Sequence, residues 1–248
     1  MSVPIIVGVT GHRDLREKDI PKLQELVAAE LKKFMERYPH SEFVLLDSIA
    51  SGADTLCADA ALALGIKLVC PLPMPVEEYR RDFSKTDAAV FDALLQQAAA
   101  VFVVPNTEPL PEVQTRNFHY RQAGLYVALH SHVLLALWDG SAAEPDGCGT
   151  AEIVSFTLRG NDKDSSHFKA ENSGAVLHIY TPRQSADAVP SVCLLESEPG
   201  SLHATLHRTD AFNADAGNVQ DSDADTAPLI SEENLSQTDQ CITGCHDL

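Results

Sequence analysis

The sequence has 248 residues, of which 44% are hydrophobic and 22% are charged, and this composition is ordinary for a globular protein. It contains 36 acidic and 18 basic residues, and the formal net charge of -18 argues against binding to nucleic acid or to an anionic membrane. No apolar run approaches the roughly 20 residues of a membrane span, and the first residues lack a secretory signal pattern. We therefore expect a cytoplasmic protein whose partners include neither nucleic acid nor a membrane.

Apolar segments alternate with helical patterns over the first 183 residues. In chain order, we expect strands at residues 5–10, 43–46, 67–71, 101–104, 133–137 and 176–180. Between them we expect helices at residues 20–38, 53–64, 88–98, 118–129 and 150–158. Strands that are apolar throughout are typical of a parallel sheet covered on both faces. The pattern predicts an α/β, Rossmann-like doubly wound fold with a mostly parallel sheet of about six strands.

The charge and the composition change after residue 183, so we place the nucleotide-binding domain at residues 1–183. Twelve of the acidic residues and one basic residue lie at 184–248, which gives this segment a net charge of -11 and the first 183 residues a net charge of -7. Low hydrophobicity with net negative charge is typical of a disordered tail, and the start of a further region is the alternative. Cys241, Cys245 and His246 lie in this segment without a second ligand pair, so we expect no metal site.

The first candidate site residues follow the first predicted strand, in the stretch from Gly8 to Leu15. Glycines there would let the backbone approach a ligand, Thr10 and the amide of Gly11 would donate to a phosphate, and Arg13 would hold it. His12 would donate to a phosphate or ribose oxygen. The alternative is that His12 and Arg13 cap the turn.

A second group lies where a predicted strand leads into a helix, at Ser51, Gly52 and Asp54. A helix N-terminus presents free amides, which favour an anion. Asp54 would accept from a ribose hydroxyl, or else cap its own helix. In the next loop Tyr79 is a candidate for contact with a base or ribose, and a solvated helix face is the alternative there.

The remaining candidates lie between residues 117 and 154. Gly147, Gly149 and Thr150 form a glycine-rich loop that opens a helix, and such a loop can hold a phosphate. Asp139 ends a predicted strand, where a ribose-binding or catalytic carboxylate would stand. Parallel strands end at one edge of a sheet, so all these loops are expected to face the same way.

Taken together, these motifs resemble the SLOG superfamily of Rossmann-like nucleotide-binding domains, which includes the LOG-type phosphoribohydrolases and DprA-like proteins. The resemblance covers residues 4–183, and the Thr-Gly-His-Arg turn is similar to that of bacterial members. The hydrolase motifs match at His119, Arg121, Pro145, Gly147, Gly149, Thr150 and Glu152. Gln122, Asp146 and Ile153 replace a lysine, a glycine and a glutamate of the family pattern.

The resemblance implies binding or sensing of a nucleotide or ribose-phosphate ligand, and a scaffold without a ligand is the plainest alternative. It also leaves open an enzyme that hydrolyses the N-glycosidic bond of a nucleoside 5′-monophosphate. In that enzyme Glu152 or Asp139 would stabilise the oxocarbenium-like transition state and Arg121 would orient the phosphate. Tyr120 would contact the base or ribose. No cofactor is expected, Mg²⁺ has no support in the sequence, and a homodimer or higher oligomer is compatible with it.

Overall fold

The computed structural model describes residues 3–105, 114–141, 149–159, 174–184, 187–197 and 204–207. Its strands are β1 (Ile5–Gly11), β2 (Phe43–Leu46), β3 (Lys67–Leu72), β4 (Ala100–Val103), β5 (Val133–Trp138), β6 (Ala175–Tyr180), β7 (Ser191–Ser197) and β8 (Ala204–His207). Its α-helices are α1 (Ile20–Arg37), α2 (Ala53–Ala63), α3 (Val76–Tyr79), α4 (Lys85–Gln97), α5 (Arg116–Leu129) and α6 (Thr150–Arg159). Two 3₁₀ helices, η1 (Glu17–Asp19) and η2 (Arg80–Asp82), complete the elements.

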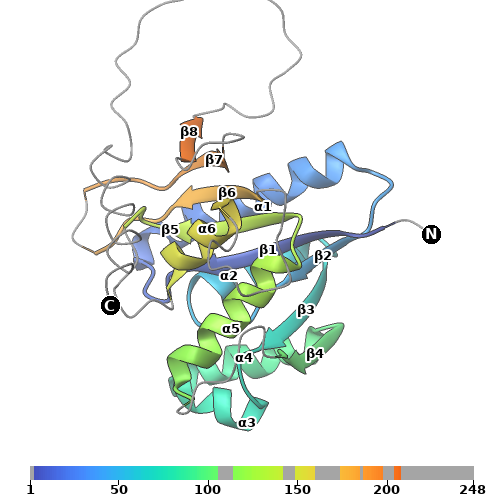
Figure 1. The fold of residues 1–248 in the computed structure, drawn as a ribbon, viewed down its shortest axis with the longest axis vertical. Coiled ribbons are helices and arrows are strands. Elements are labelled where there is room, and N and C mark those ends of the chain that lie inside the picture. The colour runs from blue at the N-terminus through green and yellow to red at the C-terminus, as the bar shows by residue number, and fades with distance from the viewer. Residues whose placement is uncertain are drawn as a thin grey trace, which may run out of the picture.

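The strands form one sheet in the order β4-β3-β2-β1-β5-β6-β7-β8. All pairs from β4 to β6 are parallel, and β7 and β8 are added antiparallel. The chain builds outward from β1 to β4 and then returns to place β5 on the other side of β1. The predicted doubly wound α/β fold is therefore confirmed (Figure 1).

Helices cover both faces of the sheet, as the apolar strands require. On one face α1, α2 and α4 pack against alternate residues of the strands, including Leu135 and Leu137 of β5. On the other face α5 and α6 pack against Leu134 and Ala136 of the same strand. Because both faces of β5 are buried, its sequence is apolar at nearly every position.

The helix boundaries follow from local chemistry. Ser84 accepts a hydrogen bond from the amide of Asp87 and caps α4, and Thr115 does the same for α5 through Phe118. Gly65 has a φ of 76° just beyond the C-terminus of α2, which is the left-handed conformation that ends many helices.

The sheet extends beyond residue 183, where the sequence pattern predicted the end of the domain. Strand β7 contains the apolar fragment from Val192 to Leu195, and Leu195 packs in the core beside α6. The sheet has eight strands among the described residues, against an expected six. The prediction missed β7, which pairs with β6, because it relied on the composition of the whole acidic segment and not on its short apolar stretch.

Candidate functional site

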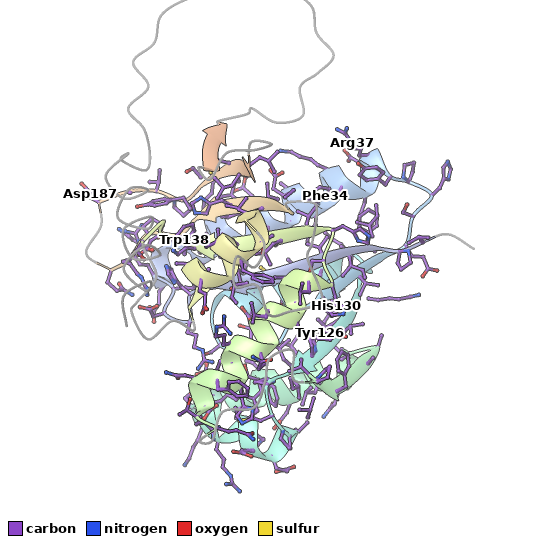
Figure 2. The ribbon with its side chains drawn as sticks, viewed as in Figure 1. Phe34, Arg37, Tyr126, His130, Trp138 and Asp187 are labelled. Carbon is purple, nitrogen blue, oxygen red and sulfur yellow. The ribbon has the colours of Figure 1, made fainter. Side chains whose placement is uncertain are left out.

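A cavity of about 490 Å³ opens at the carboxyl ends of the central strands. Residues from the end of β1 and Trp138 at the end of β5 both line it. In Figure 2, Trp138 lies at the carboxyl end of the sheet, whereas Tyr126 and His130 lie toward the amino end of β5. Strands β1 and β5 are neighbours at which the winding of the sheet reverses, and open α/β sheets bind their ligands at this switch point.

The structure brings most of the predicted site residues to this cavity. The predicted residues that line it are Thr10, Gly11, His12, Arg13, Asp54, Tyr79, Tyr120, Gly149 and Thr150. Gly147 lies outside the described residues. Ser51, Gly52, Arg121, Asp139 and Glu152 are described and do not line the cavity.

Gly11 and Gly52 are required by packing within the protein. A Cβ atom at Gly11 would overlap the side chain of Ala53, and one at Gly52 would overlap the backbone of Arg13. Gly52 also has a φ of 87°, in the left-handed region that favours glycine. The two glycines therefore let the β1 loop and the start of α2 pack closely, a role that does not require a ligand.

Arg13 presents a cation at the cavity. Its side chain is exposed, and its guanidinium carbon lies 5.0 Å from the centroid of the Tyr120 ring. The Tyr120 hydroxyl is held by Asp82, which also accepts from Arg116 at 2.6 Å. Within the described parts of the chain no carboxylate forms an ion pair with Arg13, so its charge remains available to an anion.

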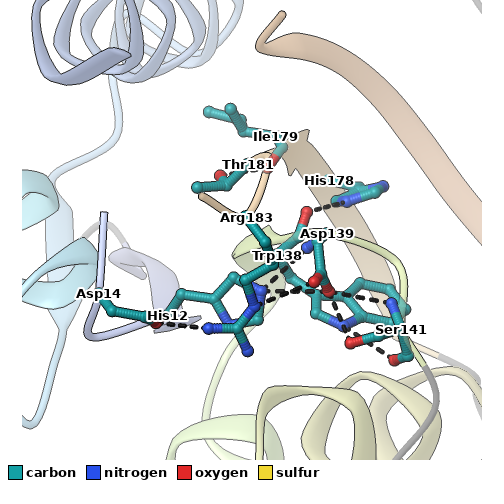
Figure 3. Close-up of polar contacts among 9 residues, drawn as sticks. All are labelled: His12, Asp14, Trp138, Asp139, Ser141, His178, Ile179, Thr181 and Arg183. Atoms are coloured by element: carbon teal, nitrogen blue, oxygen red, sulfur yellow. Dashed lines mark hydrogen bonds and ion pairs between the residues drawn. The ribbon is translucent and has the colours of Figure 1, made fainter. Parts of the chain in front are cut away.

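A polar network around Asp139 joins residues that line the cavity, among them His12, Ser141 and Arg183 (Figure 3). Asp139 accepts from both the amide and the hydroxyl of Ser141, at 3.0 and 2.6 Å, and from Nε of Arg183 at 3.0 Å. The same carboxylate lies 3.2 Å from Nε2 of His12, and Arg183 also pairs with Asp14. Asp139 thus joins the ends of β1, β5 and β6.

The hydrogen bonds of this network stabilise the ionised form of Asp139. Partial burial by itself would raise the pKa of this carboxyl, but bonds from His12 and Ser141 outweigh burial and hold the pKa well below its usual range. His12 is 8% exposed. Asp139 therefore has a structural role and holds neighbouring loops together. The sequence had predicted that its carboxylate would face a ligand.

Asp54 lies in the wall of the cavity and is 8% exposed. Its carboxylate accepts from the amide of Ala50 at 3.2 Å, so it supports the loop before α2. Burial raises the pKa of Asp54 to about 7 despite the opposing effects of that bond and of Arg13. Asp47, just beyond β2, is completely buried near it, and the pKa of Asp47 is also raised by burial and by Asp54.

Two helices, α2 and α6, begin beside the cavity. At α2 the amide of Ala53 donates to His12 at 2.9 Å and that of Thr55 donates to Ala50 at 3.2 Å. At α6, Gly149, Thr150 and Ala151 line the cavity, and the first turn of any helix carries amides without partners inside the helix. The start of α6 therefore brings three residues of a helix N-terminus to the lining of the cavity.

Arg121 and Glu152, both predicted as catalytic, contact each other. Nε of Arg121 lies 2.5 Å from Oε1 of Glu152, which joins α5 to α6, and each side chain is about one quarter exposed. Neither residue lines the cavity. The two hydrolase residues thus form an interhelical ion pair.

Tyr79 reaches the cavity, but its ring belongs to the core. The side chain is 1% exposed and packs edge-on against Phe83 and Phe91. It therefore has little surface on which a base could stack.

Several lining residues were not among the predicted site residues: Asp14, Ser48, Asn117, Trp138, Ser141 and Arg183. The position of Arg183 carried a usable signal, because it follows β6 at the edge where ligands bind in such sheets. In the described parts of the chain, no group of three His, Cys, Asp or Glu side chains is placed to hold a metal ion. No described helix is long and apolar enough to cross a membrane.

Comparisons with known proteins give no family assignment: no family model and no curated protein matches the sequence. Among solved structures, DNA processing protein A (DprA) from Streptococcus pneumoniae is similar, with a TM-score of 0.36, 15% identity, and coverage of 54% of this chain and 41% of that chain. DprA from Helicobacter pylori is similar with a TM-score of 0.39, 15% identity, and coverage of 61% of each chain. The matches span less than two thirds of either DprA chain and concern the fold alone.

The prediction that nucleic acid is not a partner is not upheld. The Helicobacter pylori protein is described by its mode of binding single-stranded DNA. The prediction was based on the net charge of the whole chain, of which the larger part lies at residues 184–248. Net charge summed over a chain does not describe the surface at one edge of its sheet.

Proposed function

We propose that this protein binds a nucleotide or a ribose-phosphate derivative in the cavity at the carboxyl ends of β1 and β5. The observation that carries the proposal is the position of Arg13 and the start of α6 on one cavity at the switch point of the sheet. A guanidinium and helix amides are both ligands for phosphate. The proposed binding needs no metal or organic cofactor, because these groups supply the positive charge.

The ring of Tyr120 gives the ligand a second anchor. It lies against Arg13 and is fixed through Asp82, which keeps its orientation constant. Asn117 and Trp138 add polar and aromatic surface to the same cavity. A phosphate on Arg13 would place the sugar and base of a nucleotide along this wall.

Binding is proposed in preference to hydrolysis because of the contacts of Glu152. Its ion pair with Arg121 lies outside the cavity lining, so the geometry gives the hydrolase alternative no direct support. Assays for free base released from AMP by the wild type and by Glu152→Ala separate the two functions. Release by the wild type that is lost in the variant would favour the enzyme.

The test of binding is calorimetry with AMP, NAD, ADP-ribose, a cyclic dinucleotide and a short single-stranded oligodeoxynucleotide. Arg13→Ala is expected to weaken the binding of the preferred ligand by about tenfold or more, which is the loss of roughly 1.4 kcal/mol or more expected for one charge-assisted contact. Arg81→Ala is the matched control, because Arg81 is exposed and does not line the cavity. If no member of the panel binds, or if both variants bind as the wild type does, the proposal fails.

A further inference from the structure

Two carboxyl groups from different elements meet behind the wall of the cavity. Asp47 follows β2 directly and Asp54 lies in the first turn of α2. Asp47 is 0% exposed and Asp54 is 8% exposed, and only Asp54 lines the cavity. Two buried carboxylates side by side repel each other and are both poorly solvated.

The hydrogen bonds of the pair leave one buried oxygen without a donor. Oδ1 of Asp47 accepts from the amide of Ile49 at 2.6 Å, and Oδ2 of Asp54 accepts from the amide of Ala50. Among the described residues, Oδ2 of Asp47 has no hydrogen-bond donor. A buried acceptor without a donor is costly; one proton on the pair removes the repulsion, and a second proton makes the pair neutral.

We propose that Asp54, with Asp47 behind it, takes up a proton when the ligand binds near neutral pH and then, as a carboxylic acid, donates a hydrogen bond to an acceptor oxygen or nitrogen of the ligand. This inference rests on the proposed function and specifies the chemistry of the ligand. The ligand carries an anionic group for Arg13 and, beside it, a neutral acceptor for Asp54. Asp47 does not reach the cavity and acts as a positioning residue.

The charge at the cavity supports a neutral pair. Arg13 is close enough to Asp54 to affect its titration. Two ionised carboxylates behind Arg13 would offset its charge and repel a phosphate, whereas a neutral pair leaves the full charge of the guanidinium for the anion. An ionised pair in this wall would therefore weaken the binding of an anion at Arg13.

The other titratable groups around the pair do not supply a competing charge. Tyr79 from α3, Cys57 on α2 and Cys70 on β3 interact electrostatically with one or both carboxyls. Burial raises the pKa of each of these side chains above its usual value, so all three are neutral near pH 7. Arg13 is the charged group that faces the pair from the described elements.

The first experiment needs no ligand and follows the side-chain carboxyl carbons of aspartate by NMR between pH 3 and pH 9. Burial and the neighbouring carboxyl are expected to give one resonance that titrates near neutrality, which is absent in Asp54→Asn and shifted in Asp47→Asn. Asp59→Asn is the control, because Asp59 is on the exposed side of the same helix. Titration of both carboxyls below about pH 5 would overturn the inference even if nucleotides bind.

The second experiment measures ADP-ribose binding from pH 6 to pH 8, because the diphosphate of this probe does not titrate in that range. The dissociation constant of the wild type and of Asp59→Asn is expected to rise about tenfold as Asp54 loses its proton. Asp54→Asn keeps a neutral donor and is expected to change less than about twofold over the same range. Equal pH dependence in Asp54→Asn and the wild type would overturn the inference, whereas absence of ADP-ribose binding at every pH, with the NMR titration intact, would count against the proposed function instead.

Discussion

At the scale of single residues, the cavity combines side chains whose roles are set by their neighbours. Arg13 lines the cavity and presents its guanidinium there, whereas the carboxylate of Asp139 is held by three donors from Ser141 and Arg183. Residue type alone does not separate these roles. The number of partners available inside the protein decides whether a charged side chain is left for a ligand.

Gly52 gives the sharpest prediction at this scale. Gly52→Ala is expected to lower the free energy of unfolding by about 2 kcal/mol or more, because the added Cβ would overlap the backbone of Arg13 at a positive φ. Gly65→Ala is the matched comparison, since Gly65 has a φ of 76° but no atom near the position of a Cβ. It is expected to cost only about 1 kcal/mol. Urea unfolding measures both, and equal losses would show that packing at Gly52 contributes nothing.

At the scale of elements, α5 and α6 form one wall of the cavity and are joined by the ion pair of Arg121 and Glu152. Helix α5 is also tied to η2, because Arg116 and Tyr120 both contact Asp82. These ties hold the ring of Tyr120 and the start of α6 in the lining of the same cavity. The residues that resemble hydrolase catalysts thus contribute to the shape of the site.

A double-mutant cycle tests this structural role. Arg121→Gln, Glu152→Gln and the double variant are expected to give a coupling energy of about 1 kcal/mol in urea unfolding, since the pair is mostly shielded from solvent. The control pair is Lys67 and Glu42, which are more than half exposed and are expected to couple by about 0.5 kcal/mol or less. A coupling no larger than that of the control would show that the ion pair does not hold the two helices together.

At the scale of the whole molecule, buried carboxyls link stability to pH in opposite directions. The raised pKa values of Asp47 and Asp54 mean that the folded chain keeps protons that the unfolded chain loses above about pH 4. The free energy of unfolding therefore falls as the pH rises from about 4 to about 7, where Asp54 loses its proton in the folded chain. The lowered pKa of Asp139 acts the other way, because its stabilising effect is lost as the pH falls through the acidic range.

Asp47→Asn is expected to gain stability relative to the wild type as the pH rises, because it removes one buried acid and can donate to Asp54. The difference in free energy of unfolding should shift in favour of the variant by roughly 2 kcal/mol between pH 4 and pH 8. Asp139→Asn should show the opposite trend and lose most at neutral pH. Chemical unfolding across this range measures both differences, and a pH-independent difference for Asp47→Asn would contradict the assignment of raised pKa values to the pair.

The sequence by itself determined the alternation of elements and therefore the class of fold. Apolar strands between amphipathic helices leave few ways to bury their surfaces, and one of these is a parallel sheet covered on both faces. The same alternation predicted which edge of the sheet carries the cavity, and nine of the predicted residues line it. This much follows because the spacing of apolar residues, which distinguishes strands from helices, is a local property of the chain.

Only the tertiary structure decided which polar residues face the cavity and which pair with one another. Arg121 and Glu152 are 31 positions apart, and Arg183 meets Asp14 across 169 positions. No local pattern contains such contacts, because they depend on the order in which the strands assemble. The pairing of β7 with β6 and the meeting of Asp47 with Asp54 have the same origin: burial and partners are fixed when distant segments pack.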